Sequence, residues 1–285
     1  MRTRTLGIAI GVALLVVGAH AQTIGNFTLT HGTATYSEGN LIGANNRADG
    51  GLAVFKTLAG GPNNMFQNWW WYHTDTSARE ASLGQQVFGT ASGNSARIVY
   101  LQNGGPTTPQ SLQFDIEYTL TEVATATALV QIVWKVHNLA NVAQDLSFFA
   151  YSDFDLDGTF GDDSGAFQSP NQFNITDGSS AYATLTASGT GLAGWEQGSF
   201  SGIRDRLTNA VQDNLVNAPA NFGPGDWTGA FQWNFNLAAN GAPGGADQQV
   251  GTLLKLVHNP VPEPASMFAL AIGAASLVAR RRRRA

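Results

Sequence analysis

Residues 112–120 read LQFDIEYTL, and apolar and polar side chains alternate along the whole stretch. A period of two places Leu, Phe, Ile, Tyr and Leu on one face of an extended strand, and Gln, Asp, Glu and Thr on the other. The same alternation recurs in residues 130–136 and 231–237. These stretches therefore predict β-strands with one face in a core and the other in water.

Most of the remaining chain also favours strands and turns, because it is rich in Gly, Asn, Thr, Ser and aromatic residues. Further strands are expected at 24–30, 52–58, 69–73, 97–101, 146–154, 181–187 and 252–258, and residues 111–121 and 127–138 are expected to form a hairpin. Apolar residues recur every four positions only in segment 203–216, which predicts one short helix. Many one-sided strands predict an all-β fold, an antiparallel β-sandwich of jelly-roll-like type.

The first 21 residues have the layout of a secretory signal peptide. Arg2 and Arg4 precede an uncharged apolar run at 6–17, and Ala19 and Ala21 fit a small-x-small cleavage site. Cleavage there would make Gln22 the first mature residue and implies passage through the Sec translocon. An uncleaved signal helix is the alternative.

The last 26 residues, 260–285, have a second three-part layout. Val261, Pro262, Glu263 and Pro264 form an extended polar motif, because each proline disfavours helix in the residue before it. Fifteen uncharged residues follow at 265–279, and a helix of that length rises about 22 Å, short of a hydrocarbon core about 30 Å thick. The basic residues after them can snorkel to the interface and stay on the cytoplasmic side, which predicts a single transmembrane helix. They are Arg280, Arg281, Arg282, Arg283 and Arg284.

This tail resembles the PEP-CTERM sorting segment of Gram-negative bacteria, which exosortases process. The resemblance implies transient anchoring in the inner membrane, processing near the VPEP motif, and a final place at the cell surface or outside the cell. It also implies an association with exopolysaccharide and biofilm. Such tails are catalogued as ice-binding protein C-terminal motifs too, but the chain lacks regular Thr-rich repeats, so ice binding is not carried over. A plain membrane anchor and a basic nucleic-acid tail are the alternatives.

Charge separates the exported domain, expected at 22–259, from both signals. Seven of the 15 basic residues lie in the terminal segments, but only Glu263 of the 20 acidic ones does, which leaves residues 22–259 a net charge of −11. An acidic domain disfavours nucleic acid as a partner and is compatible with divalent cations. The absence of cysteine excludes thiol catalysis and thiolate metal sites.

An acidic segment begins at Asp153, with Asp155 and Asp157 at alternate positions and Gly158 next. Alternate carboxylates and a glycine resemble the start of an EF-hand-type Ca²⁺ loop. Position 12 of that loop is Ser164 rather than Glu, although Asp162 and Asp163 could substitute from a differently shaped loop. A tentative Ca²⁺ site and a plain acidic turn are both open interpretations.

Residues 69–73 read WWWYH. If one face of this strand is exposed, Trp69, Trp71 and Tyr72 could form an aromatic platform for sugar rings. The alternative packs one face in the sandwich core and the other under a second layer.

Catalytic signatures are missing from the sequence. It contains no Gly-x-Ser-x-Gly, no metal-spaced histidine pair and no phosphate loop. Asp115 and Glu117 would lie roughly 6–7 Å apart along one strand, which is tolerable for a glycosidase but also typical of a solvated strand face. The expectation is therefore an exported surface or matrix protein that is not an enzyme. A Ca²⁺-dependent carbohydrate-binding module is the alternative, and a glycoside-active enzyme is a more distant one.

Overall fold

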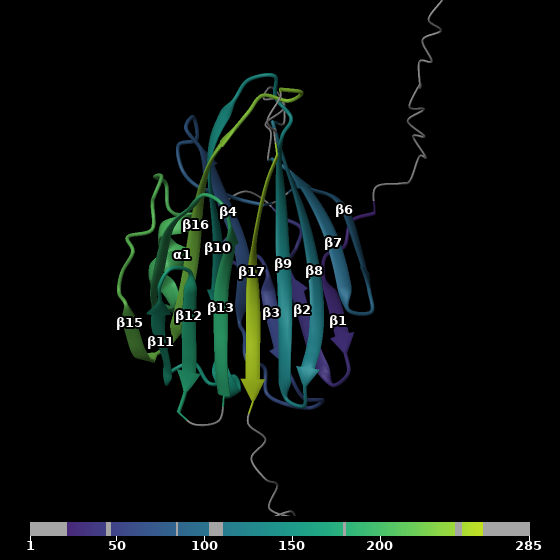
Figure 1. Cartoon of the computed structure of the whole chain (residues 1–285), viewed down its shortest axis with the longest axis vertical. Helices are drawn as coiled ribbons and strands as arrows, with labels where there is room; N and C mark the ends of the chain where they lie inside the picture. Colours follow the sequence, from purple (N-terminus) through teal and green to yellow (C-terminus); the bar gives the residue numbers. More distant parts are fainter. Residues whose placement is uncertain are drawn as a thin grey trace, which may run out of the picture.

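The computed structural model describes residues 22–43, 47–83, 85–102, 111–178, 181–242 and 247–258. They form two β-sheets that face each other, as Figure 1 shows, and every pairing between named strands is antiparallel. The predicted antiparallel sandwich is confirmed. The predicted signal helix and transmembrane helix lie outside the described residues. No helix within those residues has the length and apolar character needed to cross a membrane.

The first sheet has the order β1-β2-β3-β4-β10-β16-β14, with β5 on β4. The second has the order β15-β11-β12-β13-β17-β9-β8-β7-β6. In the first sheet, the bounds are β1 Phe27–His31, β2 Ala34–Gly39, β3 Leu52–Lys56, β4 Gln67–Thr74, β5 Ala81–Ser82, β10 Gln144–Asp153, β14 Leu192–Ser199 and β16 Trp227–Leu237. In the second, they are β6 Gln85–Ser92, β7 Ser95–Leu101, β8 Leu112–Ala124, β9 Thr127–Asn138, β11 Asp163–Gln168, β12 Gln172–Asp177, β13 Ala181–Gly189, β15 Asn221–Gly225 and β17 Asp247–His258.

The predicted hairpin is the pair β8–β9. Ile116 lies opposite Trp134 in its register, and both are fully buried between the sheets. On the outer face, Asp115 accepts two hydrogen bonds from Arg97 at 2.9 and 2.5 Å, and Lys135 lies 2.8 Å from Glu117. Asp115 and Glu117 therefore each form a cross-strand ion pair, although Asp115 is only 5 % exposed.

The helix is shorter than predicted. It spans α1, Phe200–Thr208, and buries Ile203 and Leu207 against the first sheet. The chain after Thr208 leaves the helical path, so Val211 is exposed although it continues the four-residue spacing. Side-chain bonds to the sheet hold this irregular segment: Gln212 donates to the Thr74 carbonyl, and Glu80 accepts from the Asp213 amide. Tertiary hydrogen bonds thus replaced the helical ones that periodicity predicts for 209–216.

One acid, Glu38, is buried in the core between the sheets among tyrosine side chains. Glu38 is 1 % exposed, and its carboxylate accepts hydrogen bonds from the hydroxyls of Tyr36 and Tyr118 and from the amide of Asn68. Burial raises the pKa of Glu38 to about 8, although these three hydrogen bonds act in the opposite direction.

Candidate metal centre

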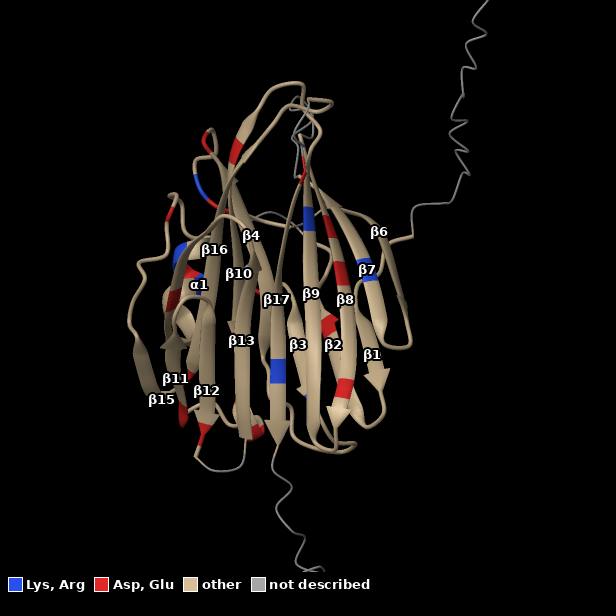
Figure 2. Ribbon diagram, viewed as in Figure 1, with Lys and Arg blue, Asp and Glu red and all other residues tan. Residues whose placement is uncertain are grey.

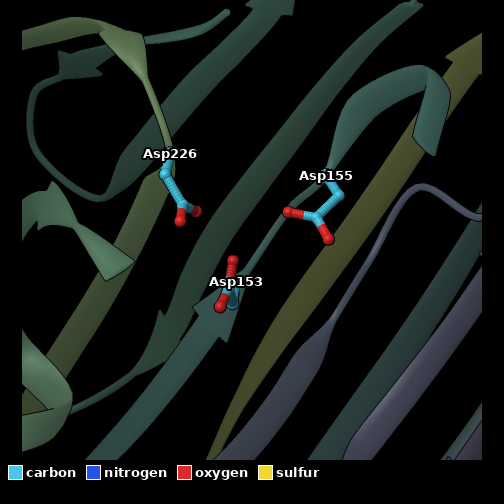
Figure 3. A group of neighbouring side chains, drawn as sticks. All are labelled: Asp153, Asp155 and Asp226. Atoms are coloured by element: carbon cyan, nitrogen blue, oxygen red, sulfur yellow. The ribbon is translucent and has the colours of Figure 1, made fainter. Parts of the chain in front are cut away.

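Three carboxylates meet at one end of the first sheet. Asp153 is the last residue of β10, Asp155 follows in the loop, and Asp226 comes directly before β16. Because β10 and β16 are antiparallel neighbours, with Asp153 opposite Thr228, the end of one strand lies beside the start of the other. Figure 3 shows the three side chains converging on one space.

The carboxylate oxygens offered by the three side chains lie within 4.8 Å of one another. Among the described residues this is the one group of three or more acidic or histidine side chains packed so closely. Asp153 is 1 % exposed, and neither of its oxygens has a hydrogen-bond partner within the described part of the chain. A buried carboxylate without a donor is costly unless it is neutralised by a proton or by a cation.

Burial and mutual repulsion both act on this group. Burial raises the pKa of Asp153 well above its ordinary value, and the nearby charges of Asp155 and Asp226 add to the shift, whereas the charge of Arg204 and the Tyr151 hydroxyl act in the opposite direction. Burial, followed by the charge of Asp226, raises the pKa of Asp155 to about 6, and burial raises the pKa of Asp226 as well. Each shift has the same meaning: the charged forms of these three carboxyl groups are disfavoured.

The three carboxylates line an open pocket of about 270 Å³. Its other lining residues are aromatic: Phe66, Phe160 and Phe200. The rings of Phe66 and Phe200 meet edge to face at 5.6 Å, and Phe160 is 68 % exposed. The pocket therefore combines an acidic floor with an apolar rim that solvent reaches.

The other three residues of the expected Ca²⁺ set do not join this group. Asp157 adopts a φ of 56° in the short 3-10 turn η1, Leu156–Gly158, and its Oδ1 lies 3.0 Å from Nδ1 of His258. Asp162 accepts a hydrogen bond from the Thr159 hydroxyl. Asp163 lies opposite Asp177 in the β11–β12 register, and burial raises its pKa to about 8. The five-residue set is thus corrected: Asp157, Asp162 and Asp163 do not join the close group, although Asp163 accepts a hydrogen bond from the Leu156 amide next to Asp155.

Asp226 was missed at the sequence level. It lies 71 positions from Asp155 in a Gly-Asp-Trp context that reads as an ordinary turn before a strand. Only the pairing of β10 with β16 brings it to the site, and alternation predicts strands but not their partners.

The aromatic platform is contradicted, because Trp69, Trp71 and Tyr72 are at most 2 % exposed. Tyr72 faces the second sheet and packs on Phe114. Trp71 lies on the opposite face, against Tyr151, whose hydroxyl donates to the Phe200 carbonyl in α1. The alternative with a second packed layer is therefore the one the structure shows.

Comparison with known proteins bears on the tail. Residues 260–284 match the model of the PEP-CTERM protein-sorting motif. The chain carries a PEP-CTERM sorting motif. This PEP-CTERM motif marks an exported protein that an exosortase sorts, as the resemblance predicted. The motif, the arginines after it and the signal-peptide residues Ala19 and Ala21 lie outside the described residues, so their structure is not part of the site.

No curated protein sequence matches the chain. Solved structures that resemble it include a bacterial glucoamylase in complex with acarbose (9 % identity, TM-score 0.49, 85 % of this chain and 33 % of that one), so this chain spans about a third of that enzyme. A putative aldose 1-epimerase from Escherichia coli K12 also resembles it, with 9 % identity and a TM-score of 0.45 over 82 % of this chain and 99 % of that one. A galactose mutarotase related enzyme from Lactobacillus acidophilus does so with 8 % identity and a TM-score of 0.40 over 82 % of this chain and 97 % of that one.

These neighbours overturn the prediction that the chain is not an enzyme, because the structures that resemble this sandwich bear the names of enzymes. Identities of 8–9 % concern the fold alone, and they assign no reaction or substrate to this chain.

Proposed function

We propose that this exported protein binds Ca²⁺ at the end of its sandwich, through Asp153, Asp155 and Asp226. The observation that carries the proposal is Asp153, a buried carboxylate without a hydrogen-bond donor in the described part of the chain that points between two other carboxylates. A divalent cation at this point would replace the missing donors and cancel the repulsion among the three groups.

The donor set fits a hard cation. Ca²⁺ takes six to eight oxygens at about 2.3–2.6 Å, and three carboxylates supply at most six, so water or ligand oxygens from the open pocket would complete the shell. An all-oxygen set also favours Ca²⁺, Mg²⁺ or Mn²⁺ over zinc. Because the ligands come from two segments of the chain rather than from one tight loop, affinity in the extracellular range of about 10⁻⁴–10⁻³ M is expected.

Thermal unfolding of the purified protein with and without CaCl₂ tests the proposal. At a Ca²⁺ concentration about 100-fold above Kd, binding stabilises the folded state by about 2.7 kcal/mol. For a domain of this size such a gain raises Tm by about 5–10 °C. Isothermal calorimetry of the same protein gives Kd directly.

Substitutions separate a cation site from an acidic turn. Asp155→Asn and Asp226→Asn should remove the Ca²⁺-dependent rise in Tm, and Asp226→Asn should raise Tm in EDTA because it relieves repulsion. Asp247→Asn is the matched control, since Asp247 is an exposed partner of His137 at the start of β17. A Ca²⁺ response that survives both site substitutions, or no response at about 100 mM Ca²⁺, 100-fold above the weakest expected Kd, would refute the site.

The same pocket supports a second role, contact with a polysaccharide at the cell surface or in a biofilm matrix. Its specific support is the rim, where the rings of Phe66 and Phe160 are exposed beside oxygens that can share a cation with sugar hydroxyls. Pull-downs on dextran, cellulose and xanthan, in Ca²⁺ or in EGTA, test it. Ca²⁺-dependent retention that Phe160→Ala abolishes and Val142→Ala preserves would support the role. Retention that is indifferent to both EGTA and Phe160→Ala would exclude the pocket from it.

A further inference from the structure

The pocket and the start of the sorting tail lie at the same end of the sandwich. β17 ends at His258, and the PEP-CTERM match begins two residues later. The Asp157 carboxylate lies 3.0 Å from the His258 imidazole, and Asp157 is only two residues from the pocket carboxylate of Asp155. Phe160 of the pocket rim follows in the same loop.

This end is also acidic. Figure 2 shows red segments at the lower ends of β11 and β12, at the end of the sheets where β17 reaches its last residue. Asp163 and Asp177 are paired in register there, and the Coulomb interactions of Asp163 extend to Asp155 and Asp162.

The chain between this end and the apolar stretch is short. Six residues, 259–264, lie between His258 and Ala265, so a fully extended connection of seven Cα-to-Cα steps spans at most about 25 Å. The sandwich is longer than that, because the twelve residues of β9 alone extend about 36 Å. While the apolar stretch sits in a bilayer, the tethered end cannot move far from the lipid surface.

We infer that the pocket end of the sandwich faces the lipid bilayer until the tail is removed, and that processing in the VPEP motif opens the pocket to large extracellular partners. The inference rests on the proposed function for the identity of the site, since it concerns access to that pocket. Ions and small solutes would reach the pocket both before and after the tail is removed. The membrane would hinder a large polymer from entering the pocket while the tail is inserted.

The absence of cysteine makes access measurable, because any introduced thiol is unique. Phe160→Cys places one at the pocket rim, and Val123→Cys places one near the β8–β9 turn, beside the end of β17. Val142→Cys is the control at the opposite end, in the loop after β9. Native Phe160, Val123 and Val142 are all exposed, so these substitutions leave the core intact.

Each full-length variant is reconstituted into nanodiscs of uncharged phosphatidylcholine and labelled with N-ethylmaleimide or with a long polyethylene-glycol maleimide. Dividing the labelling rate of the polymer by that of N-ethylmaleimide corrects for differences in thiol reactivity among the variants. We expect the polymer to react several-fold more slowly than the small reagent in the Phe160→Cys and Val123→Cys variants, relative to the Val142→Cys variant. A flexible Gly/Ser insertion of about 40 residues after His258, with a root-mean-square span of about 35 Å, should restore the rate.

Equal ratios in all three variants when they are bound to nanodiscs would overturn the inference. Failure of the chain to remain with the nanodiscs would overturn its premise, the insertion of the tail. Neither result depends on Ca²⁺, so a failed Ca²⁺ titration and a failed orientation test remain distinguishable.

Discussion

Replacing Glu38 by Gln should change how the stability of this protein depends on pH. Glu38 lies in the core between the sheets, 1 % exposed, with Tyr36, Asn68 and Tyr118 as hydrogen-bond donors. Its pKa is about 8 in the folded protein and 4.5 in the unfolded chain, so the folded state retains a proton that the unfolded chain releases. Glutamine has the shape of the protonated acid and does not titrate.

The sign and size of the effect follow from linkage. Between pH 4.5 and about 8 the folded state binds more protons at this position, so the contribution of Glu38 to stability is lost as the pH rises. Each pH unit within that window lowers the free energy of unfolding by about 1.4 kcal/mol, and the whole window lowers it by about 5 kcal/mol. Other acids with raised pKa values add slopes of the same sign, but they are common to both proteins and cancel in the difference.

Urea unfolding of the wild type and of Glu38→Gln at pH 5, 6.5 and 8 measures this difference. The variant should be close to the wild type at pH 5 and more stable than it by several kcal/mol at pH 8. Glu117→Gln, on the outer face of β8, is the matched control for loss of a carboxylate. Parallel pH profiles for the wild type and Glu38→Gln would refute a protonated acid in the core.

Three further predictions concern packing and surface charge. Trp70→Ala should cost about 3–5 kcal/mol in urea unfolding, because its fully buried ring contacts both Trp134 and Tyr118 between the sheets; a loss below 1 kcal/mol would contradict that packing. Gly51→Ala should lower Tm sharply, since the residue has a φ of +62° and a Cβ there would lie 2.0 Å from the backbone oxygen of residue 68; unchanged Tm would show that the loop is built differently. Lys135→Ala should cost less than about 1 kcal/mol, because its ion pair is solvent-exposed; a larger loss, persisting in high salt, would show that the pair acts as a buried one.

Several strands were predictable because their apolar face is continuous in the sequence. The segments at 112–120, 130–136 and 231–237 lie in β8, β9 and β16, and each turns its alternate apolar residues inward. The predicted helix was correct only where Ile203 and Leu207 contact the sheet. Beyond Thr208 the apolar residues still recur every four positions. The hydrogen bonds of Gln212 and Asp213 to distant segments nevertheless hold the backbone in a non-helical path.

The sequence by itself determined the strand type, the acidic charge of residues 22–259 and the sorting motif, because each depends on residues close together along the chain. Tertiary structure decided which acids meet and which aromatics are exposed. Strand pairing added Asp226 to Asp153 and Asp155, while the turn at η1 removed Asp157. A covering layer buried the outer face of β4, so among the described residues the rings of Phe66 and Phe160 are exposed and that of Trp71 is not. Both outcomes depend on contacts between segments far apart in sequence, and local periodicity carries no information about those contacts.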